Sequence, residues 1–318
     1  FKGPPMLWDG AQPASAMASG SAASTLLLSV RFILQVGLLI KVGHHKLIEW
    51  RSLSKACALT MSQLKINKVI IGVAMSQNIY DDPGFFAGYA TLDRSVKGLD
   101  GAPEWPAIQR LLPALDGLRV VDLGCGYGWF CRWAQQQGAK QIIGFDLSNR
   151  MLERAREMTT GETIEYRCAD LQTLTLPAES CDLVYSSLAL HYLPDVAPLF
   201  ATLYQALVPG GTLVFSAEHP IYTAPLQQGW QVDEQGRKRW PVSHYQQEGE
   251  RISNWFAEGV IKQHRKLSSW INALIAAGFV LEQLDEWGPS AEQIAAQPAL
   301  EEEKERPMIF LLRAGKPA

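Results

Sequence analysis

Short runs of consecutive apolar residues recur through the middle of the chain, and segments with helical spacing of their apolar positions separate them. A short, continuous apolar run that ends at glycines predicts a strand buried on both faces of a parallel sheet. Alternation of such strands with helices predicts an α/β domain. The expected strands are residues 120–123, 142–145, 164–167, 181–187 and 212–215.

Capping residues mark the ends of several expected helices. Ser148 and Asp195 are predicted N-caps, and Gly278 is a predicted C-cap. The expected helices are 130–137, 149–158, 196–207 and one from Ser268 or Ser269 to 277. The pattern also predicts two final strands, 279–284 and 308–312, separated by a short helix that opens with the capping box at 290–293. The acidic run 301–303 is expected to be a solvated face.

The first strand ends in glycines at every second position, Gly124, Gly126 and Gly128. Glycine takes positive φ without strain and lets a ligand lie against the backbone. The next helix points its free N–H groups and its positive dipole end at this turn. Dinucleotide dehydrogenases carry G-x-G-x-x-G, whereas this chain has G-x-G-x-G. We therefore expect a nucleotide-type site that differs from a dinucleotide site.

The segment Asp-Leu-Gly-Cys-Gly-Tyr-Gly at 122–128 resembles the first motif of class I methyltransferases that use S-adenosylmethionine. Three further features fall where this resemblance requires them. Asp146 ends the second strand, Asp170-Leu171 follows the third, and Pro-Gly-Gly at 209–211 precedes the fifth. Together they cover about residues 105–217, and the chain is most similar to the broad bacterial type 11 group. The resemblance implies a seven-stranded Rossmann-like sheet of order 3-2-1-4-5-7-6, with the last strand antiparallel and helices on both faces.

The resemblance also implies which residues hold S-adenosylmethionine. The glycine turn would lie under the methionine part, Asp146 would accept hydrogen bonds from the ribose hydroxyls, and Asp170 would bind the adenine. Leu147 or Met151 would lie against the adenine ring, although a core role for Met151 is an open alternative. The expected cofactor residues are Asp122, Gly124, Cys125, Gly126, Asp146, Leu147, Met151, Asp170, Leu171, Ser187, Tyr89 and Arg94.

Two segments outside the shared core are candidate covers of the site. Residues 75–113 resemble the N-terminal helical lid of the family, where Tyr89 and Arg94 are candidates to contact the methionine carboxylate. Residues 218–266 form a long insert rich in tryptophan, tyrosine and histidine, with a hairpin turn expected at Gly236. We interpret this insert as the substrate cover, and the alternative is a satellite hydrophobic cluster that protects the sheet edge. Both segments are parts of one methyltransferase domain over 75–318.

A sulfonium methyl group is already activated, so the reaction is expected to be an in-line displacement without a nucleophilic residue. Positioning the acceptor can supply about 7 to 11 kcal/mol. If the acceptor is a hydroxyl or carboxyl group, a nearby base assists, and the candidates are His191, His219 and His264. His219 is the first choice because it directly follows the fifth strand. His191 lies in the loop that follows the fourth.

The N-terminal residues 1–74 do not fit this pattern. An Ala/Ser/Gly-rich run precedes an apolar stretch over 25–40, which Arg31 and Gln35 interrupt. That stretch is shorter than the roughly 20 apolar residues of a spanning helix. Met75 looks like an ordinary start just before the first family-like residues, so our hypothesis is that 1–74 is a poorly ordered or non-native extension.

The charge of the chain limits its expected binding partners, and its cysteine spacing indicates its cellular compartment. The formal net charge of the 318 residues is -3, so no general basic field is available to hold nucleic acid. We expect a small-molecule methyl acceptor, no nucleic-acid or membrane partner, and no bound metal. The five cysteines show no C-x-x-C spacing, which is typical of a reduced cytoplasmic protein. The oligomeric state stays open.

Three other functions compete with a methyltransferase. An NAD-dependent Rossmann oxidoreductase is disfavoured by the G-x-G-x-G spacing and by Asp170. An aminopropyl transferase would need an acidic cluster for a polyamine, and none is evident. A non-catalytic S-adenosylmethionine-binding protein is also open, because the sequence does not single out a catalytic base. Neither the acceptor nor the atom that is methylated follows from the sequence.

Overall fold

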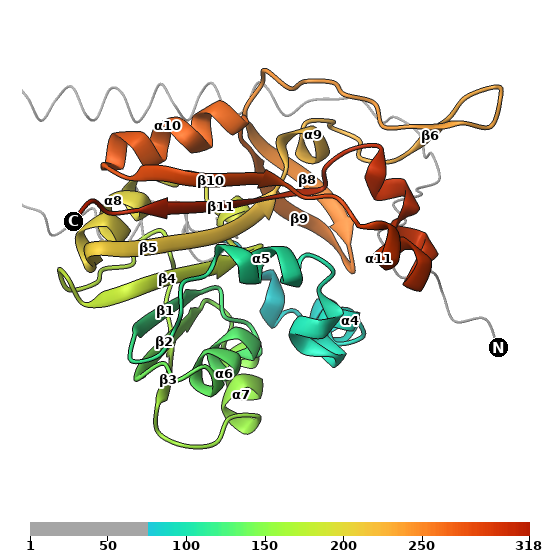
Figure 1. Ribbon diagram of the computed structural model, residues 1–318. Helices are drawn as coiled ribbons and strands as arrows, with labels where there is room; N and C mark the ends of the chain where they lie inside the picture. Colours follow the sequence, from blue (N-terminus) through green and yellow to red (C-terminus); the bar gives the residue numbers. More distant parts are fainter. Residues whose placement is uncertain (1–75) are drawn as a thin grey trace, which may run out of the picture. The chain divides into compact units, whose positions relative to one another are not determined.

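The computed structural model describes residues 76–318, and the predictions for residues 1–74 lie outside this range. The centre of the described part is one seven-stranded sheet of order β10-β11-β5-β4-β1-β2-β3 (Figure 1). β11 pairs antiparallel with both β5 and β10, and the remaining pairs are parallel. This is the predicted order. The strands are β1 Arg119–Leu123, β2 Gln141–Asp146, β3 Ile164–Cys168, β4 Cys181–Ser187, β5 Leu207–Glu218, β10 Val280–Glu286 and β11 Ile309–Gly315.

Helices cover both faces of this sheet because the central strands are apolar on both faces. Val120 of β1 belongs to a buried cluster with Ile108 and Ala134, which come from α5 and α6. The next residue, Val121, belongs to a second cluster with Leu203 and Trp270, which come from α8 and α10. Successive side chains of a strand point to opposite faces, so one apolar strand supplies both layers of the core.

The helices begin and end largely where the sequence predicts. Ser148 accepts a hydrogen bond from the Met151 amide, and Gly278 ends α10 with φ 104°. Ser290 and Gln293 form the predicted capping box. The helices and 3₁₀ turns are η1 Ile79–Asp81, α3 Pro83–Tyr89, α4 Asp93–Val96, η2 Gly98–Gly101, α5 Trp105–Leu111, α6 Trp129–Gln136, α7 Asn149–Glu157, η3 Leu190–Tyr192, α8 Ala197–Ala206, α9 Pro220–Thr223, α10 Leu267–Ala277, α11 Ala291–Ala296 and η4 Pro298–Lys304.

Three local predictions are wrong. Asp195 is not the N-cap of α8, because Val196 takes that position, although Asp195 accepts a hydrogen bond from the Ala197 amide. The Pro-Gly-Gly segment lies inside β5 instead of forming a separate turn, because Gly210 donates to Lys316 and Gly211 accepts from it, which extends the pairing with β11. The acidic run is not wholly solvated. Glu303 is buried because Arg306, one turn later, pairs with it at 2.6 Å.

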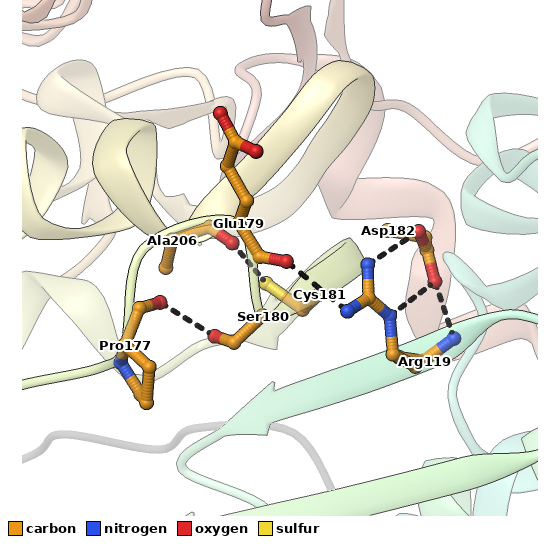
Figure 2. Close-up of polar contacts among 7 residues, drawn as sticks. All are labelled: Arg119, Pro177, Glu179, Ser180, Cys181, Asp182 and Ala206. Carbon is orange, nitrogen blue, oxygen red and sulfur yellow. Dashed lines mark hydrogen bonds and ion pairs between the residues drawn. The ribbon is translucent and has the colours of Figure 1, made fainter.

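An ion pair at the amino ends of β1 and β4 aligns the two central strands. Figure 2 shows the Arg119 guanidinium donating to both carboxylate oxygens of Asp182, each at 3.0 Å. The Arg119 amide donates to the same carboxylate, and its guanidinium also reaches the carbonyl of Glu179. A bidentate pair of this kind fixes geometry as well as supplying energy. It lies at the edge opposite the glycine turn.

The insert after β5 contains two small hairpins. β6 Gln231–Val232 and β7 Lys238–Arg239 pair around Gly236, as predicted. β8 Gly249–Trp255 and β9 Ala257–His264 form a longer hairpin that the sequence analysis did not predict. Along residues 76–318, no helix combines the length and apolar character needed to cross a bilayer.

Candidate functional site

The glycine turn between β1 and α6 is tied to the end of β2. The Gly124 and Cys125 amides both donate to the carbonyl of Phe145, at 2.8 and 2.9 Å. Gly124 and Gly126 have φ of 74° and 52°, a region that side chains with a Cβ rarely adopt. A Cβ on Gly126 would meet no heavy atom of residues 76–318 within 4 Å, so these residues leave open space beside it. The turn therefore leaves its backbone accessible to a ligand.

Asp146, at the carboxyl end of β2, joins this turn to the next helix. Its Oδ2 accepts a hydrogen bond from the Gly126 amide and its Oδ1 accepts one from the Ser148 amide, both at 2.9 Å. Burial raises the pKa of this carboxyl. Each oxygen has accepted one hydrogen bond and keeps a second lone pair, so the carboxylate can still receive the two hydroxyls of a ribose. The residues present therefore fit a nucleoside cofactor.

The predicted adenine region lies at the ends of β2 and β3. Asp170 accepts hydrogen bonds from the hydroxyl and amide of Ser76, at 2.9 and 3.2 Å, and from the Gln172 amide. The side chain of Met151 is buried on α7, and the Leu147 carbonyl accepts a hydrogen bond from the side-chain Nδ2 of Asn78 at 3.4 Å. The contact of Ser76 with Asp170 brings the N-terminal segment across this region. Leu171 packs against the second core cluster.

Asp122, a predicted cofactor residue, lies beneath the turn, and only 2% of it is exposed. Its Oδ2 accepts a hydrogen bond from the Cys131 thiol at 3.2 Å. Burial raises the pKa of Asp122 to about 7 and that of Cys125 to about 11. These groups support the turn from inside. Ser187, at the end of β4, accepts a hydrogen bond from the Ser216 hydroxyl at 3.2 Å.

The lid residues lie against the insert. Tyr89 makes edge-on contacts with Tyr127 of the glycine turn and with Trp255 of β8, with ring centroids 5.9 and 6.3 Å apart. Phe85 is buried and also contacts Trp255, at 5.3 Å. Arg94 pairs with Glu104 at 3.1 Å, so its charge is balanced within the lid. The lid and the β8–β9 hairpin therefore contact each other through aromatic side chains.

The three candidate histidines differ in what their ring nitrogens bind. His219 accepts from the Ile221 amide at Nδ1 and bonds Glu286 at Nε2, 2.8 Å away. His264 bonds Thr223 through Nδ1 and the Tyr245 carbonyl through Nε2. His191 has a buried Nδ1 with no hydrogen-bond partner among the described residues. Burial lowers the pKa of His191 to about 4, so the ring is neutral near pH 7.

The structure also brings two residues to His191 that the sequence analysis missed. Glu218, the last residue of β5, has its Oε1 3.9 Å from Nε2 of His191, and Lys262 of β9 forms an ion pair with the same carboxylate. Burial alone would raise the pKa of Glu218, but the positive charge of Lys262 lowers it overall. A signal for Glu218 was available, because it is a carboxylate that directly ends an apolar strand. Lys262 shares the buried face of β9 with Val260 and His264, a period-2 pattern.

Comparison with known proteins identifies relatives that share this fold. A family model described as a methyltransferase domain matches residues 121–215. The crystal structure of an S-adenosylmethionine-dependent methyltransferase from Mesorhizobium loti is 54% identical, with a TM-score of 0.67, over 69% of this chain and 100% of that chain. A Listeria monocytogenes structure assigned to the same class is 37% identical, with a TM-score of 0.65, over 70% of this chain and 100% of the other.

Two curated relatives add context. An uncharacterized protein of Haemophilus influenzae is 33% identical over 251 residues, which are 75% of this chain and 97% of that protein. A malonyl-[acyl-carrier protein] O-methyltransferase of Pectobacterium atrosepticum is 37% identical over 122 residues. That match spans 38% of this chain and 47% of the relative, so less than half of the malonyl enzyme is represented.

Proposed function

The chain belongs to the class I S-adenosylmethionine-dependent methyltransferases of the type 11 group, and on this premise we propose that it methylates a small molecule held where β4 and β5 end. The cofactor supplies an electrophilic methyl group on a sulfonium sulfur. The chain has to bind this donor, align the acceptor with it and keep water away. Each of these tasks has candidate residues.

One observation carries the cofactor half of the proposal. The Asp146 carboxylate bridges the glycine turn and α7 through the amides of Gly126 and Ser148, and it keeps lone pairs for a ribose. We assign the sugar to Asp146, the methionine part to the turn at 124–126, and the adenine to the region of Asp170. Asp122 and Cys125 support the turn from below.

The lid at 75–113 and the insert at 218–266 are proposed to close over the acceptor. Their contact is aromatic, between Phe85, Tyr89 and Trp255, and it is reinforced by Gln77, whose side chain bonds the backbone of Gly259 and Ile261. A cover of this kind excludes water from the methyl donor. An enclosed site suits a small acceptor better than a folded macromolecule.

For the base, the geometry favours His191 over His219, the first choice of the sequence analysis. Both ring nitrogens of His219 are bonded, and one of them caps α9. Within the part of the chain that the structure describes, Nδ1 of His191 has no hydrogen-bond partner, and this residue lies shortly after the end of β4. Its neighbour Tyr192 bonds Tyr80 through the two phenol oxygens, 3.2 Å apart, and Tyr80 contacts Tyr89 edge-on, with ring centroids 5.3 Å apart. His191 is thus connected to the lid.

Two measurements test this proposal. Isothermal titration of the protein should show binding of S-adenosylmethionine and none of NAD, and Asp146→Asn should weaken the binding at least tenfold without unfolding the protein. With S-adenosylmethionine labelled in the methyl group, label should enter the deproteinised small-molecule fraction of a bacterial extract. Label found only in nucleic acid or protein would contradict the proposal.

A further inference from the structure

A buried cluster of a carboxylate, an ammonium group and an imidazole lies beside the carboxyl ends of β4 and β5. Glu218 ends β5, His191 lies in η3 just after β4, and Lys262 reaches in from β9 of the insert. Their side chains are 5%, 3% and 1% exposed. Charged groups are seldom buried this deeply unless they are paired or bind a ligand. Ligands of open parallel sheets bind outside this same edge.

Two atoms of the cluster are unsatisfied. Lys262 pairs with Oε1 of Glu218, whereas Oε2 is buried and has no hydrogen-bond partner among residues 76–318. Nδ1 of His191 is also buried without a hydrogen-bond partner among these residues. Nε2 of His191 lies 3.9 Å from Glu218 Oε1, beyond hydrogen-bond length. Native proteins leave few buried polar atoms unpaired, and such atoms often have a functional role. Here two lie on neighbouring side chains.

The chemistry of these atoms defines what they can bind. An ionised carboxylate oxygen only accepts hydrogen bonds, so Oε2 of Glu218 requires an O–H or N–H donor. A neutral imidazole protonated at Nε2, the nitrogen on the side of Glu218, presents Nδ1 as a second acceptor. Both atoms therefore suit a donor, and neither suits an anion. A second carboxylate here would lie beside that of Glu218 without a free positive charge of the cluster to balance it.

Resting on the proposed function, we propose that Glu218 and His191 bind the methyl acceptor directly and that this acceptor presents a hydroxyl or N–H group, not a carboxylate. In the transfer, the acceptor oxygen or nitrogen bonds to the methyl carbon while the sulfur–carbon bond breaks and its electron pair stays on sulfur. The proton of the acceptor moves to Nδ1 of His191. The adjacent carboxylate of Glu218 stabilises the imidazolium, and Lys262 keeps that carboxylate ionised and in place.

This inference separates the chain from the malonyl-[acyl-carrier protein] O-methyltransferases that match its core. A malonyl group ends in a carboxylate, and that acceptor carries a negative charge. The matched region is shared, but the cluster draws Lys262 from the β8–β9 hairpin of the insert. The insert would therefore determine which methyl acceptor binds, while the shared core determines that S-adenosylmethionine is the methyl donor.

The labelled product provides the first test, because methyl esters and methyl ethers or amines differ in stability. Wild-type protein, S-adenosylmethionine labelled in the methyl group and a deproteinised bacterial extract are incubated, and the product is treated with mild alkali. The label should stay in the non-volatile product. Release of the label as methanol would show a carboxylate acceptor and overturn the inference. Absence of label from small molecules, despite cofactor binding by calorimetry, would instead overturn the proposed small-molecule function.

A binding test uses phenol and benzoate, which share a ring and differ in the charge of the polar group. Phenol should shift the imidazole ¹⁵N resonances of His191 in the cofactor-loaded protein, and benzoate should not. Glu218→Gln should weaken the phenol response and the transfer rate at least tenfold while cofactor affinity changes less than twofold. Equal binding of benzoate, or an unchanged Glu218→Gln variant, would overturn the inference.

Glu218→Gln leaves Lys262 without its carboxylate, so the variant needs structural controls. The double variant Glu218→Gln/Lys262→Met removes both charges together and should fold while losing the phenol response. Glu303→Gln is the matched control, because Glu303 is also a buried carboxylate that pairs with one cation, Arg306. It should lower stability without altering the phenol response. Loss of the response in Glu303→Gln as well would attribute the effect to folding and overturn the assignment to Glu218.

Discussion

The open space beside Gly126 makes a quantitative prediction. Gly126 and Gly117 have similar positive φ, 52° and 70°, and an added Cβ at either would meet no heavy atom within 4 Å. Gly117 lies before β1, at the edge away from the proposed site, and Gly126 lies in the turn after it. Alanine at either position should therefore cost about 1 to 2 kcal/mol of folding free energy from the left-handed backbone alone.

The two substitutions should differ in cofactor binding. The methyl group of Gly126→Ala enters the space that we assign to the methionine part of the cofactor. Forcing an extra methyl group into a packed contact costs about 1 to 3 kcal/mol, which corresponds to a roughly five- to 150-fold rise in Kd. Gly117→Ala should leave Kd within about twofold.

Denaturant unfolding and isothermal titration with S-adenosylmethionine measure the two quantities on the same samples. The expected result is similar destabilisation of both variants and loss of affinity only for Gly126→Ala. If Gly126→Ala bound the cofactor as tightly as the parent, the placement of the ligand on this turn would be wrong. If both variants lost affinity equally, the effect would come from folding, and the comparison would fail.

Three further predictions concern buried groups. Burial raises the Asp122 pKa from 3.8 to about 7, so ionisation of this carboxyl destabilises the folded state as the pH rises through this range. The free energy of unfolding of Asp122→Asn should therefore increase relative to that of the parent by up to about 4 kcal/mol between pH 4 and 8, measured by denaturant unfolding. Burial lowers the His191 pKa from 6.5 to about 4, so the free energy of unfolding should fall by up to about 3 kcal/mol as the pH drops from 6.5 toward 4. The free energy of unfolding of His191→Asn should fall less over the same pH range. Phe85→Ala removes a buried ring against Trp255 and should speed hydrogen exchange in the lid and β8 and weaken cofactor binding.

Asp182→Asn is the control for the first of these, because the hydrogen bond from Arg119 lowers the Asp182 pKa and the pH trend should reverse. If the free energy of unfolding of Asp122→Asn changed with pH in the same way as that of the parent, a raised Asp122 pKa would be contradicted. For His191→Asn, an acid transition identical to the parent would show that this ring does not resist protonation. For Phe85→Ala, unchanged exchange in the lid would mean that the aromatic contact is not what closes it.

The strands and helices were predictable because they depend on local sequence, whereas the order of the sheet followed from the resemblance of the motifs to those of class I methyltransferases. Short apolar runs such as 120–123 and 142–145, which end at glycine or an acid, predict buried strands, and glycines at alternate positions after the first strand mark the turn. The acid that ends β2 was equally local, since the strand itself carries Asp146 to the edge. The caps at Ser148, Gly278 and Ser290 follow from short-range hydrogen bonding in the same way.

Only the tertiary structure decided which side chains share an environment. Position alone ranked His219 above His191, but Glu286 and the Ile221 amide occupy both ring nitrogens of His219, whereas Nδ1 of His191 has no hydrogen-bond partner among residues 76–318. Lys262 and Glu218 stand 44 residues apart, and no local pattern pairs them. Strand and turn preferences act over a few residues, whereas burial and charge pairing depend on segments that meet only in the folded chain. The sequence alone thus predicted the residues of the proposed donor half of the site, and only folding brought together those of the proposed acceptor half.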